Sequence, residues 1–343
     1  MGVVGPSEAE VAEAVAAAAA VVPVGSGTHR EVGGPVPAGT EIAAPRGIVA
    51  YDPAELTVTV GPGTTVAELD AVLAAHDQES LLDPRDPHAT IGGVLATGLS
   101  GHRRLRVGPL RDRVLEVRFA TADGRLVRGG GPTVKNVTGY DVPRLLVGSL
   151  GTLGVLTRVI VRSSPRPRLS RWYRTHGDPA AVRAACFAPS LIAWGPEHTT
   201  VLLEGNPDDV ATQATAAGLD ATSDELSWPS GGHRGRISVA PGRLRELGAA
   251  LTARGVAWLA EWGVGTVHVA SGTEAGLAEA RAAAGAAGGW LLREAGAPGL
   301  DGFGVALPNA AVMNRIKGAF DPTGKLAPGR LPFAATPAQR QAS

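Results

Sequence analysis

Glycine gathers in four separate segments within the first 160 residues of this chain, and no other feature restricts its fold as much. The segments are Gly25–Gly27, Thr90–Gly101, Gly108–Asp112 and Gly148–Val155. Glycine lets the main chain approach a neighbour closely, because it has no Cβ and tolerates a left-handed backbone. Four such segments suit a long, extended ligand better than a single phosphate. The alternative is that each segment forms an independent turn.

The first segment follows a short strand pattern, Val21–Val24, and has to be compared with the dinucleotide-binding turn of a Rossmann fold. That turn needs a third glycine three residues on, followed at once by a helix. Arg30 occupies the third-glycine position, and the glycines and prolines of residues 31–37 cannot start a helix. The sequence therefore excludes a Rossmann turn. Successive backbone N–H groups of this loop can still hold a phosphate.

Composition excludes several classes of protein. The 343 residues carry 32 basic and 32 acidic side chains, so no global field favours nucleic acid. A single cysteine, Cys186, excludes an internal disulfide, a thiolate-held iron–sulfur cluster and a cysteine-rich zinc site. No uncharged span of 18 residues occurs, and no basic residue precedes Arg30. We therefore expect no transmembrane segment and no signal peptide, and a cytoplasmic protein.

The hydrophobic pattern predicts two halves that differ in the order of their helices and strands. In the first half, Ser7 and Glu10 form a capping-box pattern at the start of an alanine-rich helix. The residues Ser163–Pro167 then break the chain, which indicates a domain boundary. In the second half, strands alternate with helices in β-α-β order, typical of an α+β domain with helices on one sheet face.

Motifs in the first half carry a resemblance to a known family. They are Thr90–Gly101, Gly108–Asp112, Lys135–Asp141 and Gly151–Thr157, and the resemblance resumes at Phe320–Arg330. Together they resemble the FAD-binding domain of the vanillyl-alcohol oxidase/PCMH superfamily. Within it, the chain is most similar to the FAD-binding subunits of bacterial glycolate oxidases.

The resemblance implies an α+β fold with a defined division of the chain. A PCMH-type FAD-binding domain of two subdomains is expected at residues 1–167, followed by an α+β cap with ferredoxin-like β-α-β order at 168–306. A C-terminal segment, 307–333, returns to the FAD domain, and residues 334–343 form a tail.

FAD is the cofactor that the resemblance implies. The first glycine loop would hold its pyrophosphate through backbone amides, and the other glycine segments would line or flank the rest. The implied cofactor-binding residues are Gly25, Ser26, Gly27, Thr28, His29, Thr90, Ile91, Gly92, Gly93, Ala96, Thr97, Gly98, Gly108, Asp112, Gly154 and Val155. Some relatives attach FAD covalently through a histidine in the first loop. The spacing of His29 differs from theirs, so a lining or surface role for His29 is expected.

Three residues are candidates for catalysis: Tyr140, Lys135 and His268. The cap lacks the His-x-Gly-Asp-Gly-Asn-x-His segment that 2-hydroxy-acid dehydrogenases of the superfamily carry, and no histidine pair has a metal-binding spacing, so no metal site is predicted. His268 alternates with apolar residues and is either a general base or a structural histidine. Tyr140, Lys135 and the adjacent Asp141 act near the flavin or have structural roles, Asp141 as a helix cap.

The expected function is that of an FAD-binding oxidoreductase subunit of a glycolate oxidase-like complex. It would take part in oxidising glycolate or a similar 2-hydroxy acid and pass electrons to a partner. Expected partners are a catalytic flavoprotein and an iron–sulfur subunit, which could place the chain at the inner face of a membrane. The arginines between Arg103 and Arg113 are either solvated surface or a docking face for such a partner. Alternative functions are a non-catalytic FAD-holding scaffold and a stand-alone oxidase that uses oxygen.

Overall fold

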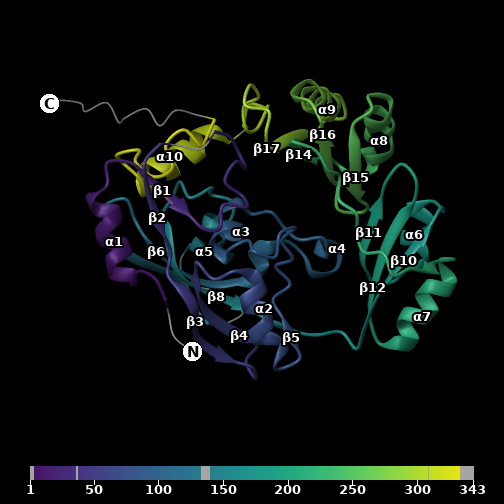
Figure 1. Ribbon diagram of the computed structural model, residues 1–343, viewed down its shortest axis with the longest axis horizontal. Coiled ribbons are helices and arrows are strands. Elements are labelled where there is room, and N and C mark those ends of the chain that lie inside the picture. The colour runs from purple at the N-terminus through teal and green to yellow at the C-terminus, as the bar shows by residue number, and fades with distance from the viewer. Residues whose placement is uncertain (1–3, 36–37, 133–139, 308, 333–343) are drawn as a thin grey trace. The chain divides into compact units, whose positions relative to one another are not determined.

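The computed structural model of this chain describes residues 4–35, 38–132, 140–307 and 309–332 (Figure 1). The chain divides into two compact units. The first unit comprises Met1–Gly101, Pro109–Arg166 and Ala306–Ser343, and the second comprises His102–Gly108 and Pro167–Val305. The boundaries expected from the sequence, after residues 167 and 306, lie within one residue of these divisions. The assignment of His102–Gly108 to the second unit was not expected.

The first unit is built on a five-stranded antiparallel sheet of order β3-β4-β8-β6-β7. Two smaller pairs, β1 with β2 in parallel and β5 with β9, accompany it. The strands are β1 (Val21–Val24), β2 (Thr40–Ala43), β3 (Arg46–Asp52), β4 (Thr57–Pro62), β5 (Gln78–Glu79), β6 (Val114–Ala120), β7 (Leu126–Gly130), β8 (Val155–Arg162) and β9 (Ser164–Pro165). The helices are α1 (Glu8–Ala17), α2 (Val66–Ala74), α3 (Ile91–Thr97), a 3-10 turn (Leu110–Arg113), α5 (Val142–Leu146) and α10 (Ala310–Phe320).

Two clusters of buried side chains hold the first unit together. The larger one joins the sheet to α2 and α3, with Phe119, Leu69 and Ile91 among its fully buried members. The smaller one joins α1 to β2, β6 and β8. The predicted capping box of α1 is confirmed, since the Ser7 hydroxyl accepts from the Glu10 N–H at 3.2 Å and the Glu10 carboxylate accepts from the Ser7 N–H at 2.7 Å.

The second unit contains two β-α-β-β-α-β repeats side by side. The first repeat is β10 (Leu169–Thr175), α6 (Pro179–Ala185), β11 (Pro189–Trp194), β12 (Thr199–Gly205), α7 (Pro207–Ala216) and β13 (Asp220–Ala221). The second is β14 (His233–Ser238), a 3-10 turn (Pro241–Arg243) leading into α8 (Leu244–Ala253), β15 (Ala257–Glu261), β16 (Thr266–Ser271), α9 (Glu274–Ala286) and β17 (Trp290–Ala295). The short helix α4 (Arg104–Val107) also belongs to this unit.

These repeats share one eight-stranded antiparallel sheet of order β13-β10-β12-β11-β15-β16-β14-β17. Each repeat has the ferredoxin-like strand order, and the repeats meet where β11 pairs with β15. The β-α-β order predicted from the sequence is present, but the sequence analysis missed β11, β13 and β15. Strands β11 and β15, which meet in the middle of the sheet, are nearly continuous runs of buried residues, which hides the alternation expected of a strand.

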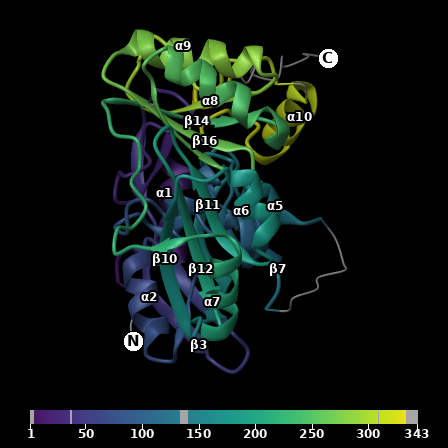
Figure 2. The ribbon, with the colours of Figure 1, turned by 90° about the vertical axis from the view of Figure 1, so that its right-hand side faces the viewer.

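Helices cover one face of this sheet. In Figure 2, α8 and α9 lie together over β14 and β16. On β16, Val267 and Val269 belong to the cluster formed with these helices, so the intervening His268 points to the opposite, helix-free face. Toward the first repeat, part of that opposite face is covered by Trp228 and Leu226, from the segment between β13 and β14.

The arginines between Arg103 and Arg113 are largely used within their own units. The side chain of Arg103 is buried and pairs with Glu204 at 3.3 Å, and Arg106 donates to the Glu204 carbonyl. Arg113 donates to the Ser164 hydroxyl at 3.1 Å. For Arg103, which is buried, the expectation of a solvated surface was wrong.

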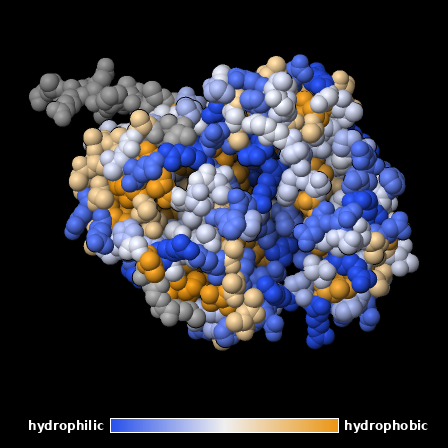
Figure 3. Space-filling model, viewed as in Figure 1, coloured by the Kyte–Doolittle hydropathy of each residue, from blue (hydrophilic) through white to orange (hydrophobic). Residues whose placement is uncertain are grey.

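The observed mixture of helices with mainly antiparallel sheets confirms the α+β class. Among the residues that the structure describes, no helix is both long and apolar enough to cross a bilayer. On the face of the molecule shown in Figure 3, hydrophobic residues lie in separate patches among hydrophilic ones.

Candidate functional site: a glycine-lined pocket in the first unit

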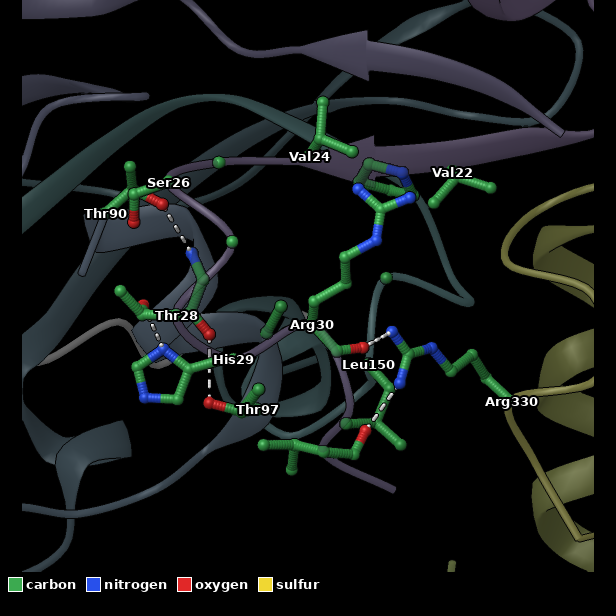
Figure 4. Close-up of a pocket in the computed structure, with 17 residues that line it drawn as sticks. Val22, Val24, Ser26, Thr28, His29, Arg30, Thr90, Thr97, Leu150 and Arg330 are labelled. Atoms are coloured by element: carbon green, nitrogen blue, oxygen red, sulfur yellow. Dashed lines mark hydrogen bonds between the residues drawn. The ribbon is translucent and has the colours of Figure 1, made fainter. Parts of the chain in front are cut away.

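A pocket of about 100 Å³ opens in the first unit, lined by three stretches that are far apart in the sequence (Figure 4). They are β1 with the loop that follows it, helix α3, and the turn at Leu150 and Gly151. Arg330, from the C-terminal segment, completes the lining. A water molecule needs about 10–15 Å³ of such volume, so there is room for several groups of that size.

The loop after β1 supplies unused hydrogen-bond donors. The main-chain N–H groups of Ser26, Gly27 and Thr28 have no acceptor within the described ranges of the chain. Gly27 has a φ of +84°, which favours glycine at the centre of the loop. A run of unpaired N–H groups in a loop is a site for an anion such as a phosphate.

Close packing against α3 explains the glycine at the start of this loop. A Cβ added to Gly25 would lie 2.2 Å from the Thr90 hydroxyl oxygen, and one added to Gly93 would lie 3.2 Å from that oxygen and 3.9 Å from Nδ1 of His29. Nδ1 of His29 is also 3.0 Å from the Thr28 hydroxyl. Because Gly25 and Gly93 have no side chain, they leave space in the pocket that a larger residue at either position would occupy.

Helix α3 forms within the second glycine segment, for which the sequence predicted no helix. The Thr90 hydroxyl accepts from the Gly93 N–H at 3.3 Å and so caps the helix, while Ile91, Val94 and Leu95 are buried in the core. The burial of these three side chains offsets the poor helix propensity of Gly92 and Gly93. As a result, this helix and its cap contribute four residues to the pocket lining: Thr90, Gly93, Ala96 and Thr97.

Ile91, Gly92 and Gly98 lie outside the pocket lining. Ile91 points into the core, and a Cβ on Gly92 would meet Pro62. Gly98 ends α3 with a φ of +67°, and a Cβ there would lie 2.9 Å from the Cα of Gly148. Gly98 thus allows the fourth glycine segment to pack against α3.

The turn that follows Gly148 brings that segment to the pocket. The N–H of Gly148 donates to the Leu95 carbonyl at 2.9 Å, and the N–H of Leu150 donates to the Ala96 carbonyl at 2.7 Å. These bonds place Leu150 and Gly151 on the pocket wall. Gly154 and Val155, expected to approach another part of FAD through the main chain, do not line this pocket: Gly154 packs against Phe119, and Val155 is buried in the cluster around α1.

Gly108 and Asp112, from the third glycine segment, do not line the pocket. Gly108 belongs to the second unit. The carboxylate of Asp112 pairs with Arg144 at 3.1 Å. Three of the four glycine segments therefore converge, and the third does not join them.

Arg330 was missed as a site residue, although the C-terminal motif contains it. Its guanidinium is buried, donates to the Val32 carbonyl at 2.7 Å and also donates to the Arg30 carbonyl. Nearby, the Val21 N–H donates to the Lys325 carbonyl and the Ala327 N–H to the Val21 carbonyl, each at 2.8 Å. The C-terminal segment is thus bonded to both β1 and the loop that follows it.

A buried ion pair holds the C-terminal segment in place. Nζ of Lys317 lies 2.5 Å from Oδ2 of Asp321 and also donates to the carbonyls of Thr152 and Leu326. Burial lowers the pKa of Lys317, and the Asp321 carboxylate opposes that effect. The same carboxylate accepts from the Leu326 N–H at 2.7 Å, which fixes the turn before Arg330.

The three catalytic candidates have different surroundings. The side chain of Tyr140 is 94% exposed, and Lys135 lies outside the described residues. Asp141 caps α5, accepting from the Arg144 N–H at 3.0 Å, as one alternative for it predicted. His268 is buried in the second unit, where its Nε2 lies 2.6 Å from Oε1 of Glu261. Sequence reasoning did not find Glu261 as the partner of His268, because Glu261 lies on the neighbouring strand, β15.

No group of three or more histidine, cysteine, aspartate or glutamate side chains in the described ranges is arranged to hold a metal ion. Cys186 is buried beneath α6 and α7, and burial raises the pKa of its thiol. The thiol therefore packs as a small apolar group.

Comparison with known proteins agrees with this geometry. Residues 3–130 match the model of the FAD binding domain family. The chain is 42% identical over 166 residues to glycolate oxidase subunit GlcE of Escherichia coli (strain K12), covering 47% of each protein. It is 38% identical over 159 residues to glycolate oxidase subunit GlcD of Bacillus subtilis (strain 168), covering 44% of this chain and 33% of that one. A D-lactate dehydrogenase of Archaeoglobus fulgidus is 41% identical over 108 residues, covering 32% of this chain and 24% of that protein.

Similarity to solved structures extends over nearly the whole chain. A structure of alkyldihydroxyacetonephosphate synthase superposes with a TM-score of 0.69 at 16% identity, covering 95% of this chain and 76% of that one. This confirms the PCMH-type fold. The chain spans about half or less of the length of the curated relatives it matches. Residues 3–130 of the first unit therefore carry an FAD-binding domain, the fold is PCMH-type, and the chain is similar to glycolate oxidase subunits and a D-lactate dehydrogenase.

Proposed function

We propose that this chain is an FAD-dependent oxidoreductase that takes part in oxidising glycolate or a similar 2-hydroxy acid as a subunit of a larger complex. The observation that carries the proposal is the pocket in the first unit. It combines unused main-chain N–H donors at Ser26–Thr28 with a wall in which Gly25, Gly93 and Gly151 carry no side chain that would narrow the pocket.

The residues that line the pocket fit the pyrophosphate part of FAD. Ser26, Gly27 and Thr28 would bind its oxygens through N–H groups, while Gly93, Thr97 and Gly151 form the adjoining wall. The hydroxyl of Thr97 donates to the Gly93 carbonyl at 2.9 Å, which leaves its lone pairs for a donor on the cofactor. Gly108, Asp112, Gly154 and Val155 have no part in this proposal. Bound FAD supplies the acceptor for an electron pair.

Among the catalytic candidates, His268 has surroundings suited to accepting a proton. Glu261 fixes one ring nitrogen, and the edge of Trp228 packs against the ring with centroids 4.6 Å apart. A carboxylate partner orients an imidazole and stabilises its protonated form. We assign His268 the hydroxyl proton of the substrate, with Glu261 as its positioning residue. Tyr140 and Lys135 remain candidates from sequence alone.

The curated relatives named as subunits favour work in a complex. The single cysteine, Cys186, provides no iron–sulfur centre in this chain. We therefore propose that a second flavoprotein and an iron–sulfur protein accept the electrons, and that this complex holds the chain at the cytoplasmic face of the membrane.

The test is anaerobic reduction of the flavin in the purified chain. Wild-type protein is expected to be yellow, and its visible absorbance should bleach on addition of glycolate or D-lactate. His268→Asn should retain FAD but bleach at least tenfold more slowly. Bleaching by dithionite alone would instead support the scaffold alternative, and substrate-dependent peroxide without a partner would support the oxidase alternative.

A further inference from the structure

The five-stranded sheet of the first unit is packed against α2 and α3 on one face, and on the other face a groove of about 540 Å³ lies open. On this open face, α1 packs against the sheet through the cluster that includes Ala120 and Val155. The groove is lined by residues from every strand of the sheet and from the first turn of α1. It is separate from the glycine-lined pocket, with which it shares no lining residue.

A row of three arginines crosses this groove. Arg118 on β6 is paired in register with Arg128 on β7 and with Arg158 on β8. Directly opposed residues of antiparallel strands carry their side chains on the same face with Cβ atoms about 4.5–5.5 Å apart, and like charges in such pairs are destabilising. The neighbouring Val117 and Val159 are buried in the cluster with α2 and α3, so the arginines point to the open face.

Two carboxylates balance only part of the charge of this row. Glu116 lies 2.9 Å from Nη2 of Arg128 and 3.5 Å from Nε of Arg118. Glu8 pairs with Arg158 and lies 3.9 Å from Nη1 of Arg118. Among the residues that the structure describes, these are the carboxylates at ion-pair distance from the row, so three positive charges are opposed by two negative ones.

The arginines are also the more accessible members of this cluster. Their side chains are between 31% and 54% exposed, whereas those of Glu8 and Glu116 are 18% and 5% exposed. Each guanidinium carries five N–H donors, more than two carboxylates can accept from three of them. The groove therefore presents guanidinium N–H groups and one unbalanced positive charge to an incoming ligand.

Apolar side chains flank the row of arginines on the two edge strands of the sheet. Leu126 on β7 is 47% exposed, and Val49 on β3 is 40% exposed. Between them, Gly61 on β4 adds no side chain, because a Cβ there would lie 2.4 Å from the Pro45 carbonyl oxygen. Arginine is enriched at the centre of protein–protein interfaces, where apolar contacts surround it.

We propose that this groove binds a segment of a partner protein in which acidic side chains lie between apolar ones. Carboxylates of the partner would accept hydrogen bonds from the row of arginines and reduce the repulsion within it. Apolar side chains of the partner would contact Leu126 and Val49. The identity of the partner as a subunit of the oxidoreductase complex rests on the proposed function, whereas the groove itself rests on the arginines and the apolar residues beside them.

The experiment measures the binding of rhodamine-labelled hexapeptides to the full-length chain by fluorescence polarisation. The probe has two central glutamates flanked by leucines, and in two matched peptides both glutamates are replaced by glutamine or by lysine. The glutamate peptide is expected to bind saturably and at least tenfold more tightly than either matched peptide, because charge-assisted hydrogen bonds form only with the carboxylates. Arg118→Gln and Arg128→Gln should each raise its Kd at least fivefold, and Arg128→Lys should recover part of the affinity.

Arg125→Gln is the matched control. Arg125 lies in the turn between β6 and β7, pairs with Asp123 and does not line the groove, so its loss should change the Kd less than twofold. Equal binding of the three peptides, or a Kd within twofold of the wild type in both groove variants, would show that the proposal is wrong. Dimerisation of the wild type that Arg128→Gln abolishes, measured by light scattering, would make a second copy the occupant and also reject it. Should Arg118→Gln fail to fold, Arg128→Gln decides, since its side chain is about half exposed.

Reduction of the flavin by a 2-hydroxy acid separates this proposal from the proposed function. Peptide binding that depends on the arginines, in a chain whose flavin no 2-hydroxy acid reduces, would reject the proposed function and leave the groove standing. Reduction of the flavin in a chain that does not bind the glutamate peptide would have the opposite meaning.

Discussion

Nη1 of Arg330 lies 2.7 Å from the carbonyl oxygen of Val32, a contact that joins positions 298 residues apart in the sequence. Val32 follows the loop whose free N–H groups line the pocket, and the same guanidinium also reaches the Arg30 carbonyl. The conformation of the pyrophosphate loop therefore depends on the C-terminal segment as well as on its own glycines.

Replacing Arg330 should weaken FAD binding. Hydrogen bonds from a charged group contribute about 1.5–3 kcal/mol each, so losing them from a loop that must be ordered should raise the Kd for FAD at least tenfold in Arg330→Ala. Fluorescence titration of the apoprotein with FAD measures this. Arg162→Ala, which removes an exposed arginine from the end of β8, is the control. Equal affinity in the two variants would show that the loop holds its shape without Arg330.

Bulk at Gly93 should exclude the flavin. A Cβ at this position already lies within 3.2 Å of the Thr90 hydroxyl, and an indole would extend into the pocket. We expect Gly93→Trp to be purified without bound FAD, as judged by its absorbance spectrum. The control is Gly285→Trp, since a Cβ at Gly285 on α9 meets nothing within 4 Å. Flavin retained at normal affinity by Gly93→Trp would place the cofactor elsewhere.

Breaking the buried pair of Lys317 and Asp321 should destabilise the first unit. Asp321→Ala leaves the Lys317 ammonium buried without its carboxylate, for which the expected cost is about 3–5 kcal/mol. Denaturant unfolding followed by circular dichroism measures the loss. Adding Lys317→Met to that variant removes the unpaired charge and should restore part of the stability. If the double variant is less stable than Asp321→Ala, the ammonium contributes through its carbonyl acceptors rather than through the carboxylate.

The pair of Arg46 and Glu68 should make a small, pH-dependent contribution to stability. The hydrogen bond from Arg46 lowers the pKa of Glu68 to about 2, from the ordinary value of 4.5. A carboxyl whose pKa is lower in the folded state stabilises above its unfolded pKa and loses that contribution as pH falls through the folded pKa. Both side chains are about half exposed, which limits the effect to the size typical of surface pairs.

Glu68→Gln tests this pair, because glutamine keeps the capping box with Thr65 and removes only the charge. The difference in Tm between wild type and Glu68→Gln should be greatest above pH 5 and should disappear as the pH approaches 2. A difference independent of pH over that range would assign the effect to packing instead of charge.

Structural features that depend on residues close together in the sequence could be predicted from the sequence. The capping box of Ser7 and Glu10 acts over three residues, so the start of α1 could be predicted without knowing the rest of the fold. The glycine loop after β1 and the β-α-β order of the second half were equally visible, because strand and helix periodicity and turn chemistry depend on neighbours in the chain. The motifs also identified the FAD-binding domain, with the α+β class that goes with it.

Only the tertiary structure decided which of these segments meet. Helix α3 forms despite Gly92 and Gly93 because Ile91 and Leu95 are buried in a core drawn from distant strands. Glu261 contacts His268 because their strands pair, and Arg330 contacts Val32 because the C-terminal segment packs against the first unit. Neither contact can be predicted from neighbouring residues in the sequence. Short-range hydrogen bonds depend on which residues are neighbours in the sequence. The long-range contacts of the chain follow from how apolar faces pack, and so the composition of the pocket wall became visible only in the folded protein.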